Sequence, residues 1–414
     1  MKVLFVLYYY FPDENANTNV TQHFINEIAD KHDVDIFAIH QGKASNMTEK
    51  YNGLSVYRSG YDYLSSEENA YLKSYKGMIR DPAGSYLLYL LKRYLLNYIP
   101  VELMVKKLPC LDALKKLVEK EKYDVIFSAS APFETHMLVS KLKKFLKSNK
   151  IKWNLLIEDP HSEYIGFKER CEYLRNLERY IYGLADKIYI FAQIAGNKND
   201  VINEFPEKKV IVNYPNFRIN KSVKRKFEFS DDEINFLYVG SLQDLNVRNP
   251  EYLYKMIYLT QNKGFHYHFV VNNWDDENRK LKQDYLKNCK NVTFYERMSI
   301  EDCISFMNSV DVVINISNLC INQVPSKIFD YIGTGKPIAN FYVNESDPAL
   351  EILNKYPLLI NMDEKMSVEE NSEVFIKKCV EFKNKTVDDD ELCELYKDYT
   401  SEFAALPVVR DLEN

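Results

Sequence analysis

The sequence predicts an α/β protein with two domains, each built on a mostly parallel sheet that carries helices on its faces. Three observations support this fold class. The chain has 414 residues, which is more than one hydrophobic core usually organises. Short apolar runs alternate with helical patterns in both halves. A charged stretch over residues 221–233 has almost no apolar periodicity and separates the two halves.

The first half opens with a strand, a helix and a second strand. Residues 3–7 form a continuous apolar run, which is typical of a strand buried on both faces. The helix is indicated by apolar residues at helical spacing over 20–28. Further strands are expected at residues 34–39, 125–128, 153–158 and 187–190, and helices at 135–147 and 168–182. The pattern predicts a Rossmann-like domain over residues 1–215, followed by a linker at 216–233.

The second half repeats the alternation. A strand at 234–239 ends at Gly240-Ser241, and a helix follows from Pro250, a residue suited to a first helical turn. Later strands are expected at 268–272, 292–295, 312–315 and 337–342, and helices at 276–288, 300–309 and 327–332. These elements predict a second Rossmann-like domain over 234–395. A tail at 396–414 is expected to pack back on the first domain.

Composition excludes several classes of protein. The stretch that comes nearest to a spanning helix, residues 86–104, is interrupted by Lys92, Arg93, Asn97, Pro100 and Glu102, whereas such a helix needs about 18 uninterrupted apolar residues. The seven cysteines are scattered and odd in number, which favours reduced thiols in the cytosol over disulfides. A pI of 5.8 and the lack of a recognition motif argue against nucleic acid as a partner. We therefore expect a cytoplasmic protein.

Residues 91–153 differ from the rest of the chain in charge. They hold 14 basic and 6 acidic residues, with apolar side chains between them. One interpretation is a set of solvated helix faces. The other is a surface that rests on anionic lipid at the inner face of the plasma membrane.

The strand that ends at Gly240-Ser241 predicts a phosphate-facing turn. In open parallel sheets, ligands bind beyond the carboxyl ends of strands, where helix N-termini present free N–H groups. Gly240 would let the chain turn sharply. Arg248 lies just before the next helix, where a guanidinium can clamp a diphosphate through two hydrogen bonds. The alternative is an ordinary glycine turn with a solvated arginine.

A second polar segment begins at Asn322 and precedes the helix at 327–332. Pro325 stands just before the helix start, so the N–H groups of Ser326 and Lys327 would face an anion, to which the Lys327 ammonium adds a positive charge. Asp330 lies about one turn further on and could accept two hydrogen bonds from a ribose. The alternative is a plain helix that stops at a glycine.

This segment resembles the nucleotide-binding signature of retaining GT-B glycosyltransferases, in particular glycosyltransferase family four and its bacterial polysaccharide relatives. In that family two glutamates separated by seven residues precede a Gly-x-Pro turn. Asp330 takes the place of the second glutamate and Asn322 that of the first, with Gly335-Lys336-Pro337 in register. The resemblance continues at Gly240-Ser241, which matches the glycine turn that opens the donor domain of the family, with Arg248 as the substitute for a basic residue usually found closer to the glycine.

The resemblance implies a GT-B enzyme with its active site in a cleft between two Rossmann-like domains, of which the first (1–215) binds the acceptor and the second (234–395) binds the donor. The enzyme would move a hexose from an NDP-sugar to a hydroxyl of a glycan or lipid-linked acceptor, with retention of configuration, in bacterial surface polysaccharide synthesis. The nucleotide-sugar is a substrate, so no cofactor is expected. The donor would contact a set of residues from the two segments: Gly240, Ser241, Arg248, Asn322, Pro325, Ser326, Lys327 and Asp330.

The first half supplies fewer candidates. His136, Asp159 and His161 come shortly after predicted strands and would face the cleft. We expect His136 and Asp159 to act in catalysis together with Arg248 and Lys327. The alternative for His136 and Asp159 is a purely structural role, which for His136 means packing against a helix or capping it.

No metal-binding motif is present in the sequence. The departing diphosphate would therefore be stabilised by Arg248, Lys327 and helix dipoles without a metal ion. Two other functions fit the same motifs. One is a nucleotide-sugar epimerase or hydrolase that acts on the donor alone. The other is a non-catalytic GT-B subunit that supports a second transferase.

Overall fold

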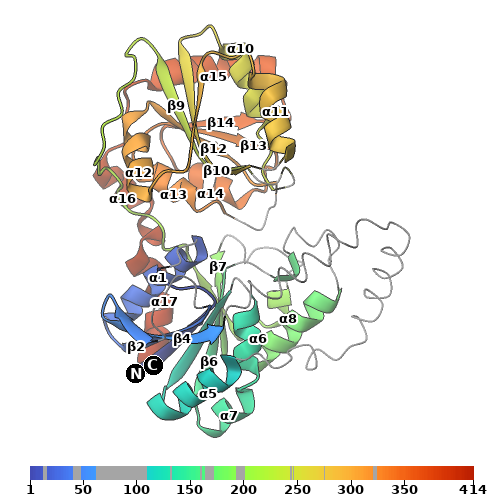
Figure 1. Cartoon of the computed structure of the whole chain (residues 1–414), viewed down its shortest axis with the longest axis vertical. Helices are drawn as coiled ribbons and strands as arrows, with labels where there is room; N and C mark the ends of the chain where they lie inside the picture. Colours follow the sequence, from blue (N-terminus) through green and yellow to red (C-terminus); the bar gives the residue numbers. More distant parts are fainter. Residues whose placement is uncertain are drawn as a thin grey trace. The chain divides into compact units, whose positions relative to one another are not determined.

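The computed structural model shows two compact units, which we describe separately (Figure 1). The first unit comprises residues 1–215 and 404–414, and the second comprises residues 216–403. The structure describes residues 1–12, 16–40, 48–61, 110–130, 133–158, 161–163, 172–192, 201–242, 245, 247–274, 276–319 and 324–414.

The first unit is built on a sheet with the strand order β3-β4-β2-β1-β5-β6-β7-β8. All neighbouring strands are parallel except the hairpin β3–β4. The central strands β1 and β5 are almost wholly buried, which explains their continuous apolar sequences. The strands are β1 (Lys2–Leu7), β2 (Asp33–His40), β3 (Thr48–Tyr51), β4 (Leu54–Tyr61), β5 (Val125–Ser130), β6 (Lys152–Ile157), β7 (Lys187–Phe191) and β8 (Lys209–Val212).

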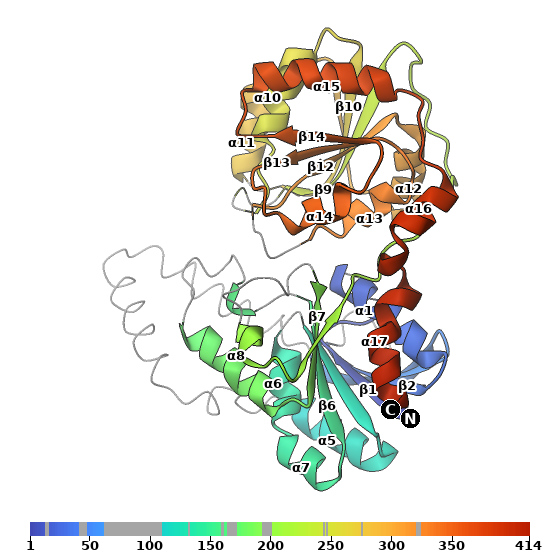
Figure 2. The same cartoon turned by 180° about the vertical axis from the view of Figure 1, so that it is seen from behind.

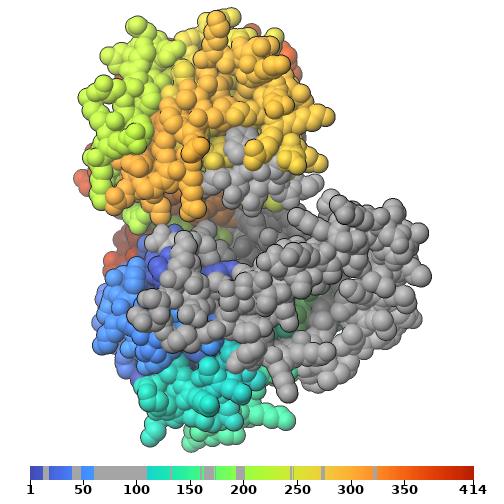
Figure 3. All heavy atoms as spheres, viewed as in Figure 1, coloured from blue at the N-terminus to red at the C-terminus, as the bar shows by residue number. Residues whose placement is uncertain are grey.

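Helices cover both faces of this sheet. Helices α1 and α17 lie on one face and α5 to α8 on the other (Figure 2). Helices α5 and α7 lie at the surface, within the cyan to green atoms of Figure 3. The helix bounds are α1 (Ala16–Ala29), α5 (Cys110–Glu121), α6 (Glu134–Ser140), α7 (Lys143–Ser148), α8 (Glu172–Leu184) and α17 (Ser401–Glu413). Short 3₁₀ turns occur at His161–Glu163 and Val201–Glu204.

The single helix expected at 135–147 is two helices. The N–H groups of Lys141 and Leu142 donate to carbonyls three residues earlier, Leu138 at 3.2 Å and Val139 at 2.9 Å. This tighter winding interrupts the α-helix between α6 and α7.

The end of the chain packs in the first unit. Asp411 on α17 accepts a hydrogen bond from the Tyr189 hydroxyl at 2.8 Å and forms an ion pair with Lys187 at 2.6 Å. Glu413 pairs with Lys31 at 3.3 Å. The N- and C-termini lie close together in both views (Figures 1 and 2).

The second unit holds a fully parallel sheet with the order β11-β10-β9-β12-β13-β14. Its strands are β9 (Ile234–Leu242), β10 (Phe265–Trp274), β11 (Val292–Tyr295), β12 (Val312–Ile316), β13 (Ile338–Tyr342) and β14 (Leu359–Asp363). Helices α10, α11 and α15 cover one face, and α12, α13 and α14 the other (Figures 1 and 2). The helices are α10 (Glu251–Thr260), α11 (Asp276–Leu286), α12 (Ile300–Ser309), α13 (Lys327–Ile332), α14 (Pro348–Leu353), α15 (Val368–Phe382) and α16 (Asp389–Leu395).

Residues 216–233, predicted from the sequence to be a linker, pack within the second unit. The Asn220 N–H donates to the Gly333 carbonyl at 2.7 Å, and the Lys224 N–H donates to the Ser305 hydroxyl at 3.0 Å. A Cβ atom at Gly333 would lie 2.2 Å from the Arg218 carbonyl. Only glycine therefore allows this close approach between the segment and the end of α13.

Two composition-based expectations concern membranes and cysteines. In the part of the chain that the structure describes, no helix is long and apolar enough to cross a membrane. The weakly charged stretch at 86–104 lies outside that part. The described cysteines are free thiols: Cys110, Cys303 and Cys379 are buried, Cys289 is half-buried and Cys393 is exposed.

Candidate functional site

The second sheet has its topological switch point between β9 and β12. The chain leaves β9 towards β10 and leaves β12 towards β13, on the opposite side. Their paired residues end at Tyr238 and Ile314. Beyond that point the Val239 N–H donates to the Tyr331 hydroxyl oxygen at 3.3 Å, and the Tyr331 hydroxyl donates to the Val239 carbonyl at 2.9 Å. Tyr331 on α13 thus replaces strand pairing where β9 and β12 diverge, at the edge where ligands bind in such sheets.

Arg248 follows β9 and lies at this switch point. Its Nη2 donates to Asn318 Oδ1 at 2.7 Å, and its Nη1 lies 3.3 Å from the Tyr238 hydroxyl and 3.4 Å from the Ser241 carbonyl. These three acceptors are neutral. Burial lowers the pKa of Arg248, but the interactions with Tyr238 outweigh it and the pKa lies above its ordinary value.

No carboxylate pairs with Arg248 among the described residues, and its buried Nε has no hydrogen-bond partner there. A cation removed from water without a counterion is costly, so such groups in proteins are usually paired. The surroundings of Arg248 therefore fit an anionic ligand.

Gly240 serves a different purpose from the one expected. The strand continues through Gly240 and Ser241 to Leu242, so no sharp turn occurs at the glycine. A Cβ atom at Gly240 would lie 2.7 Å from the Tyr238 hydroxyl and 3.4 Å from Arg248 Nη1. The glycine makes space for this contact instead. The Ser241 hydroxyl is buried and has no partner among the described residues.

The loop after β12 leads to helix α13 and contacts the loop after β9. The Leu319 N–H donates to the Val247 carbonyl at 2.8 Å, in addition to the bond between Arg248 and Asn318. The structure thus joins the two loops that carry the predicted donor residues. Asn322 lies outside the described residues.

Helix α13 begins at Lys327, as the sequence predicts. The Ile328 and Phe329 N–H groups donate to the carbonyls of Pro325 and Ser326 at 3.1 and 3.2 Å. The N–H groups of Ser326 and Lys327 therefore precede the first hydrogen-bonded turn.

The Lys327 ammonium lies 3.4 Å from Asp330 Oδ2, and the two side chains are 39% and 27% exposed. The structure thus pairs the residue predicted to contact phosphate with the residue predicted to contact ribose. Gly335 beyond them has φ +72°, the left-handed conformation that favours glycine in a turn.

In the first unit, His136 is completely buried. Its Nδ1 lies 2.7 Å from the Ser128 hydroxyl, which also accepts a hydrogen bond from Trp153 Nε1 at 2.9 Å. Burial, with a smaller effect of His161, lowers the pKa of His136 to about 3. The expectation that His136 contacts substrate is not met in this structure, because the ring is enclosed in the core and is neutral at pH 7.

Of the two other candidates in the first unit, Asp159 and His161, the structure describes only His161. Asp159 lies outside the described residues. The His161 ring stacks on Phe133 with centroids 4.7 Å apart, and burial lowers its pKa to about 4. The preceding Glu158 is buried and accepts a hydrogen bond from the Thr21 hydroxyl at 2.5 Å. Glu158 follows the last residue of β6, a position that could have singled it out beside Asp159.

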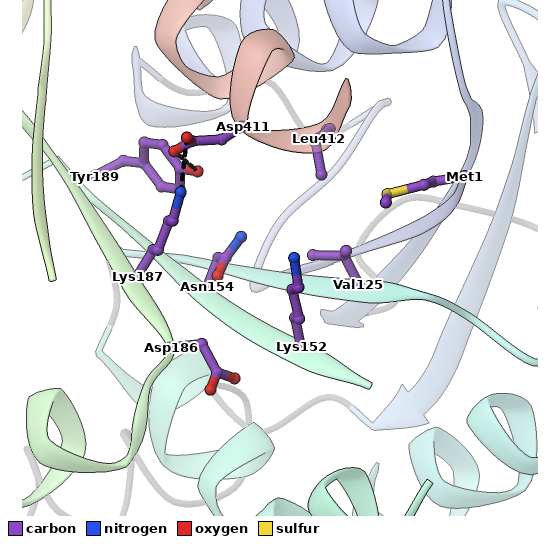
Figure 4. Close-up of a pocket in the computed structure, with 9 residues that line it drawn as sticks. All are labelled: Met1, Val125, Lys152, Asn154, Asp186, Lys187, Tyr189, Asp411 and Leu412. Atoms are coloured by element: carbon purple, nitrogen blue, oxygen red, sulfur yellow. Dashed lines mark hydrogen bonds and ion pairs between the residues drawn. The ribbon is translucent and has the colours of Figure 1, made fainter. Parts of the chain in front are cut away.

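Among the described residues, neither a metal cluster nor the cavity of the first unit points to another reaction centre. Within the described ranges, no three His, Cys, Asp or Glu side chains are placed to share a metal ion. A cavity of about 160 Å³ lies in the first unit, where Lys152 and Asn154 of β6 and Lys187 of β7 face the last turn of α17 (Figure 4). It lies at the amino ends of these strands, opposite the edge where ligands bind in parallel sheets, and none of the predicted site residues lines it.

Comparisons with known proteins agree with the fold. No family model and no curated protein sequence matches the chain. Among solved structures, sucrose-phosphate synthase from Thermosynechococcus elongatus is similar with a TM-score of 0.70 and 13% identity, over 100% of this chain and 98% of that one. The catalytic domain of starch synthase IV from Arabidopsis thaliana, bound to ADP and acarbose, has a TM-score of 0.62 and 8% identity, over 99% and 97% of the two chains.

An epimerase has the same architecture. The UDP-GlcNAc 2-epimerase from Methanocaldococcus jannaschii is similar with a TM-score of 0.54 and 14% identity, over 100% of this chain and 99% of that one. At such low identities the likeness concerns the fold and not the reaction. The two parallel-sheet units and the full-length match to GT-B glycosyltransferases show that this chain has the GT-B fold.

Proposed function

We propose that this protein is a glycosyltransferase that binds the diphosphate of a nucleotide-sugar at the switch point of its second unit. The observation that carries the proposal is Arg248, a partly buried cation at the ligand-binding edge of the sheet that contacts only neutral groups among the described residues. A diphosphate supplies the missing negative charge and accepts hydrogen bonds from a guanidinium in a bidentate geometry. The ADP in the starch synthase structure supports this class of ligand.

The same residues suit the chemistry of sugar transfer. Negative charge grows on the diphosphate as the glycosidic bond breaks, and fixed cations stabilise that charge more in the transition state than in the ground state. Arg248 and Lys327 take this role in the proposal. Asp330 accepts hydrogen bonds from the ribose, and the ammonium of Lys327 at 3.4 Å orients its carboxylate. Asn322, Pro325, Ser326 and the Gly240-Ser241 pair complete the donor site.

The finer features of the proposal come from the resemblance to family four. They are retention of configuration, transfer of a hexose without metal or cofactor, and a glycan or lipid-linked acceptor in bacterial surface polysaccharide synthesis. Asp159 remains the proposed catalytic carboxylate of the first unit. His136 is proposed to position this region through Ser128 and not to touch substrate, since its ring is enclosed.

Donor turnover distinguishes the proposed function from its alternatives. The purified protein is incubated with a panel of UDP-, GDP- and ADP-sugars in EDTA, with and without lipid-linked or oligosaccharide acceptors, and products are identified by mass spectrometry. The proposal predicts a glycosylated acceptor and little nucleotide release in its absence. An epimerised or hydrolysed sugar without acceptor would instead assign the activity of the epimerase that shares the fold. Nucleotide binding without any turnover would identify a non-catalytic subunit.

We also propose a peripheral contact with an anionic membrane on the cytoplasmic side. Residues 141–152, which include α7, hold six lysines and no acidic residue, and their colour range is that of the turquoise to sea-green atoms at the bottom of Figure 3. Within the described structure, Lys144, Lys147, Lys150 and Lys152 are exposed and form no ion pair. Clustered lysines at a surface attract anionic headgroups.

Sedimentation with vesicles tests the membrane contact. Binding is expected to need anionic lipid and to weaken as salt rises, because surface charges are screened beyond about 10 Å at 0.1 M. Replacing Lys144 and Lys147 by glutamine is expected to reduce it. Replacing Lys280 and Lys287, which are exposed on and just after α11, is the matched control. Equal recovery with neutral and anionic vesicles would show that the lysines are only a solvated face.

A further inference from the structure

The Arg248 side chain is held by groups from two different strands and their loops. Tyr238 belongs to β9, and Asn318 follows β12. We propose that Tyr238 and Asn318 are positioning residues that hold the Arg248 guanidinium in place with neutral oxygens, so that its charge stays available to a diphosphate. This inference rests on the proposed function and deepens it, because it names residues that determine the affinity of the donor site for doubly charged ligands.

Tyr238 orients the Nη1 side of the guanidinium. Its hydroxyl oxygen lies 3.3 Å from Arg248 Nη1, and the hydroxyl donates to the Ser241 carbonyl at 3.2 Å. The ring can take this position because Gly240 carries no Cβ atom, which would lie 2.7 Å from the Tyr238 hydroxyl. The phenol thus supports the cation without cancelling its charge.

Asn318 orients the Nη2 side. Its Oδ1 accepts the shortest hydrogen bond of the cluster, at 2.7 Å. An aspartate here would have nearly the same shape and would form an ion pair with Arg248. Because the residue is an amide, the charge of the arginine remains uncompensated in this part of the structure, at the cost of burying a cation.

Two further groups support an anionic occupant. Arg248 Nε and the Ser241 hydroxyl are both buried without a partner among the described residues, and both can donate hydrogen bonds. Buried polar groups in proteins are nearly always hydrogen-bonded, so these two donors, beside a cation with no carboxylate partner in the described part of the chain, call for an acceptor-rich ligand. Phosphate oxygens meet this need.

The test replaces the neutral amide by its isosteric acid. In Asn318→Asp, the new carboxylate would pair with Arg248 and take the place of the ligand's charge. We expect the affinity for UDP, and for inorganic pyrophosphate as a probe without sugar or base, to fall at least tenfold. The dependence of affinity on salt should become weaker, and the thermal midpoint of unfolding should stay the same or rise. Asn361→Asp on β14 is the control, since it adds the same charge next to Asn340 and not next to Arg248.

Two variants keep the test decisive if Asn318→Asp folds poorly. Asn318→Ala removes the acceptor without adding charge and should weaken binding by a smaller factor than Asn318→Asp. Tyr238→Phe should weaken binding while it leaves the fold intact. In turnover assays these positioning variants should lower kcat as well as raise KM for the donor, because the charge that they position also stabilises the departing diphosphate.

The outcomes separate the two proposals. If the wild type binds UDP and pyrophosphate but Asn318→Asp binds them equally well, the positioning role is wrong and the donor site stands. If the wild type binds neither nucleoside diphosphates nor pyrophosphate, the proposed function fails and this inference fails with it. A loss of affinity in Asn361→Asp equal to that in Asn318→Asp would also overturn the inference, because any added charge would then suffice.

Discussion

Replacing Arg248 by methionine should separate folding from binding. Methionine has a similar length and no charge. The change removes one short charge-assisted hydrogen bond to Asn318 and two longer ones to Tyr238 and Ser241. A hydrogen bond to a charged group contributes about 1.5–3 kcal/mol. Burial of an ion costs several kcal/mol. These two effects oppose each other, so the free energy of unfolding should change by no more than about 2 kcal/mol.

Nucleotide binding should respond quite differently to Arg248→Met. Loss of one partner of a desolvated charge pair costs about 2–5 kcal/mol, which corresponds to a loss of affinity of about 30-fold to several thousand-fold. The assay pairs urea denaturation with calorimetric titration of UDP, GDP and ADP. Arg225→Met, at an exposed arginine of the same unit, is the control. Unchanged nucleotide affinity in a destabilised Arg248→Met protein would refute the reasoning, because it would make Arg248 a structural residue.

Three further predictions follow from single contacts. Lys327→Ala should lower turnover more than nucleotide affinity. Asp330→Ala should mainly raise KM for the donor, by the equivalent of about 1.5–3 kcal/mol. Steady-state kinetics on the folded variants measure both effects, and a change in kcat alone in both variants would contradict these two roles. Gly333→Ala should lower the free energy of unfolding by about 1–3 kcal/mol, since its Cβ would meet the Arg218 carbonyl at 2.2 Å, and an unchanged denaturation midpoint would refute it. Burial lowers the pKa of His136 from 6.5 to about 3 on folding, so the unfolded state binds more protons than the folded state at acid pH. The free energy of unfolding should therefore decrease as pH falls below about 6.5. His136→Phe should make this pH dependence shallower in unfolding curves from pH 7 to 4, and an unchanged slope would contradict the shift.

Much of the fold could be predicted because its strands are buried on both faces. Their apolar runs, such as Val3–Leu7 and Val312–Ile316, stand out without an alignment. The hairpin β3–β4 was missed because Thr48–Tyr51 has no apolar run and is half exposed. Asn52-Gly53 between the two strands was an available signal, since both residues have positive φ, as a tight hairpin turn requires.

The candidate site could be predicted only in part. Arg248 and Lys327 can be proposed from the sequence because they are charged residues near helix starts that follow buried strands. Tyr238 and Asn318 were not found as partners of Arg248, since Asn318 lies 70 residues away in the sequence and approaches only because β9 and β12 are neighbours in the sheet. The sharp turn expected at Gly240 does not occur. The space that this glycine provides for Tyr238 and Arg248 depends on side chains that meet only in the folded protein.

The central claim is that the second unit binds a nucleoside diphosphate through Arg248, Lys327 and Asp330. The most direct test is a thermal-shift and calorimetric titration of the full chain with UDP, GDP and ADP in EDTA, for the wild type and for the Lys327→Ala, Asp330→Ala double variant. We expect at least one of these nucleoside diphosphates to bind the wild type without metal. At a ligand concentration of 100 times the dissociation constant, it should raise the free energy of unfolding by about 2.7 kcal/mol. The folded double variant should bind it much more weakly. Equal affinity in the double variant, or stabilisation that disappears in EDTA, would contradict the account.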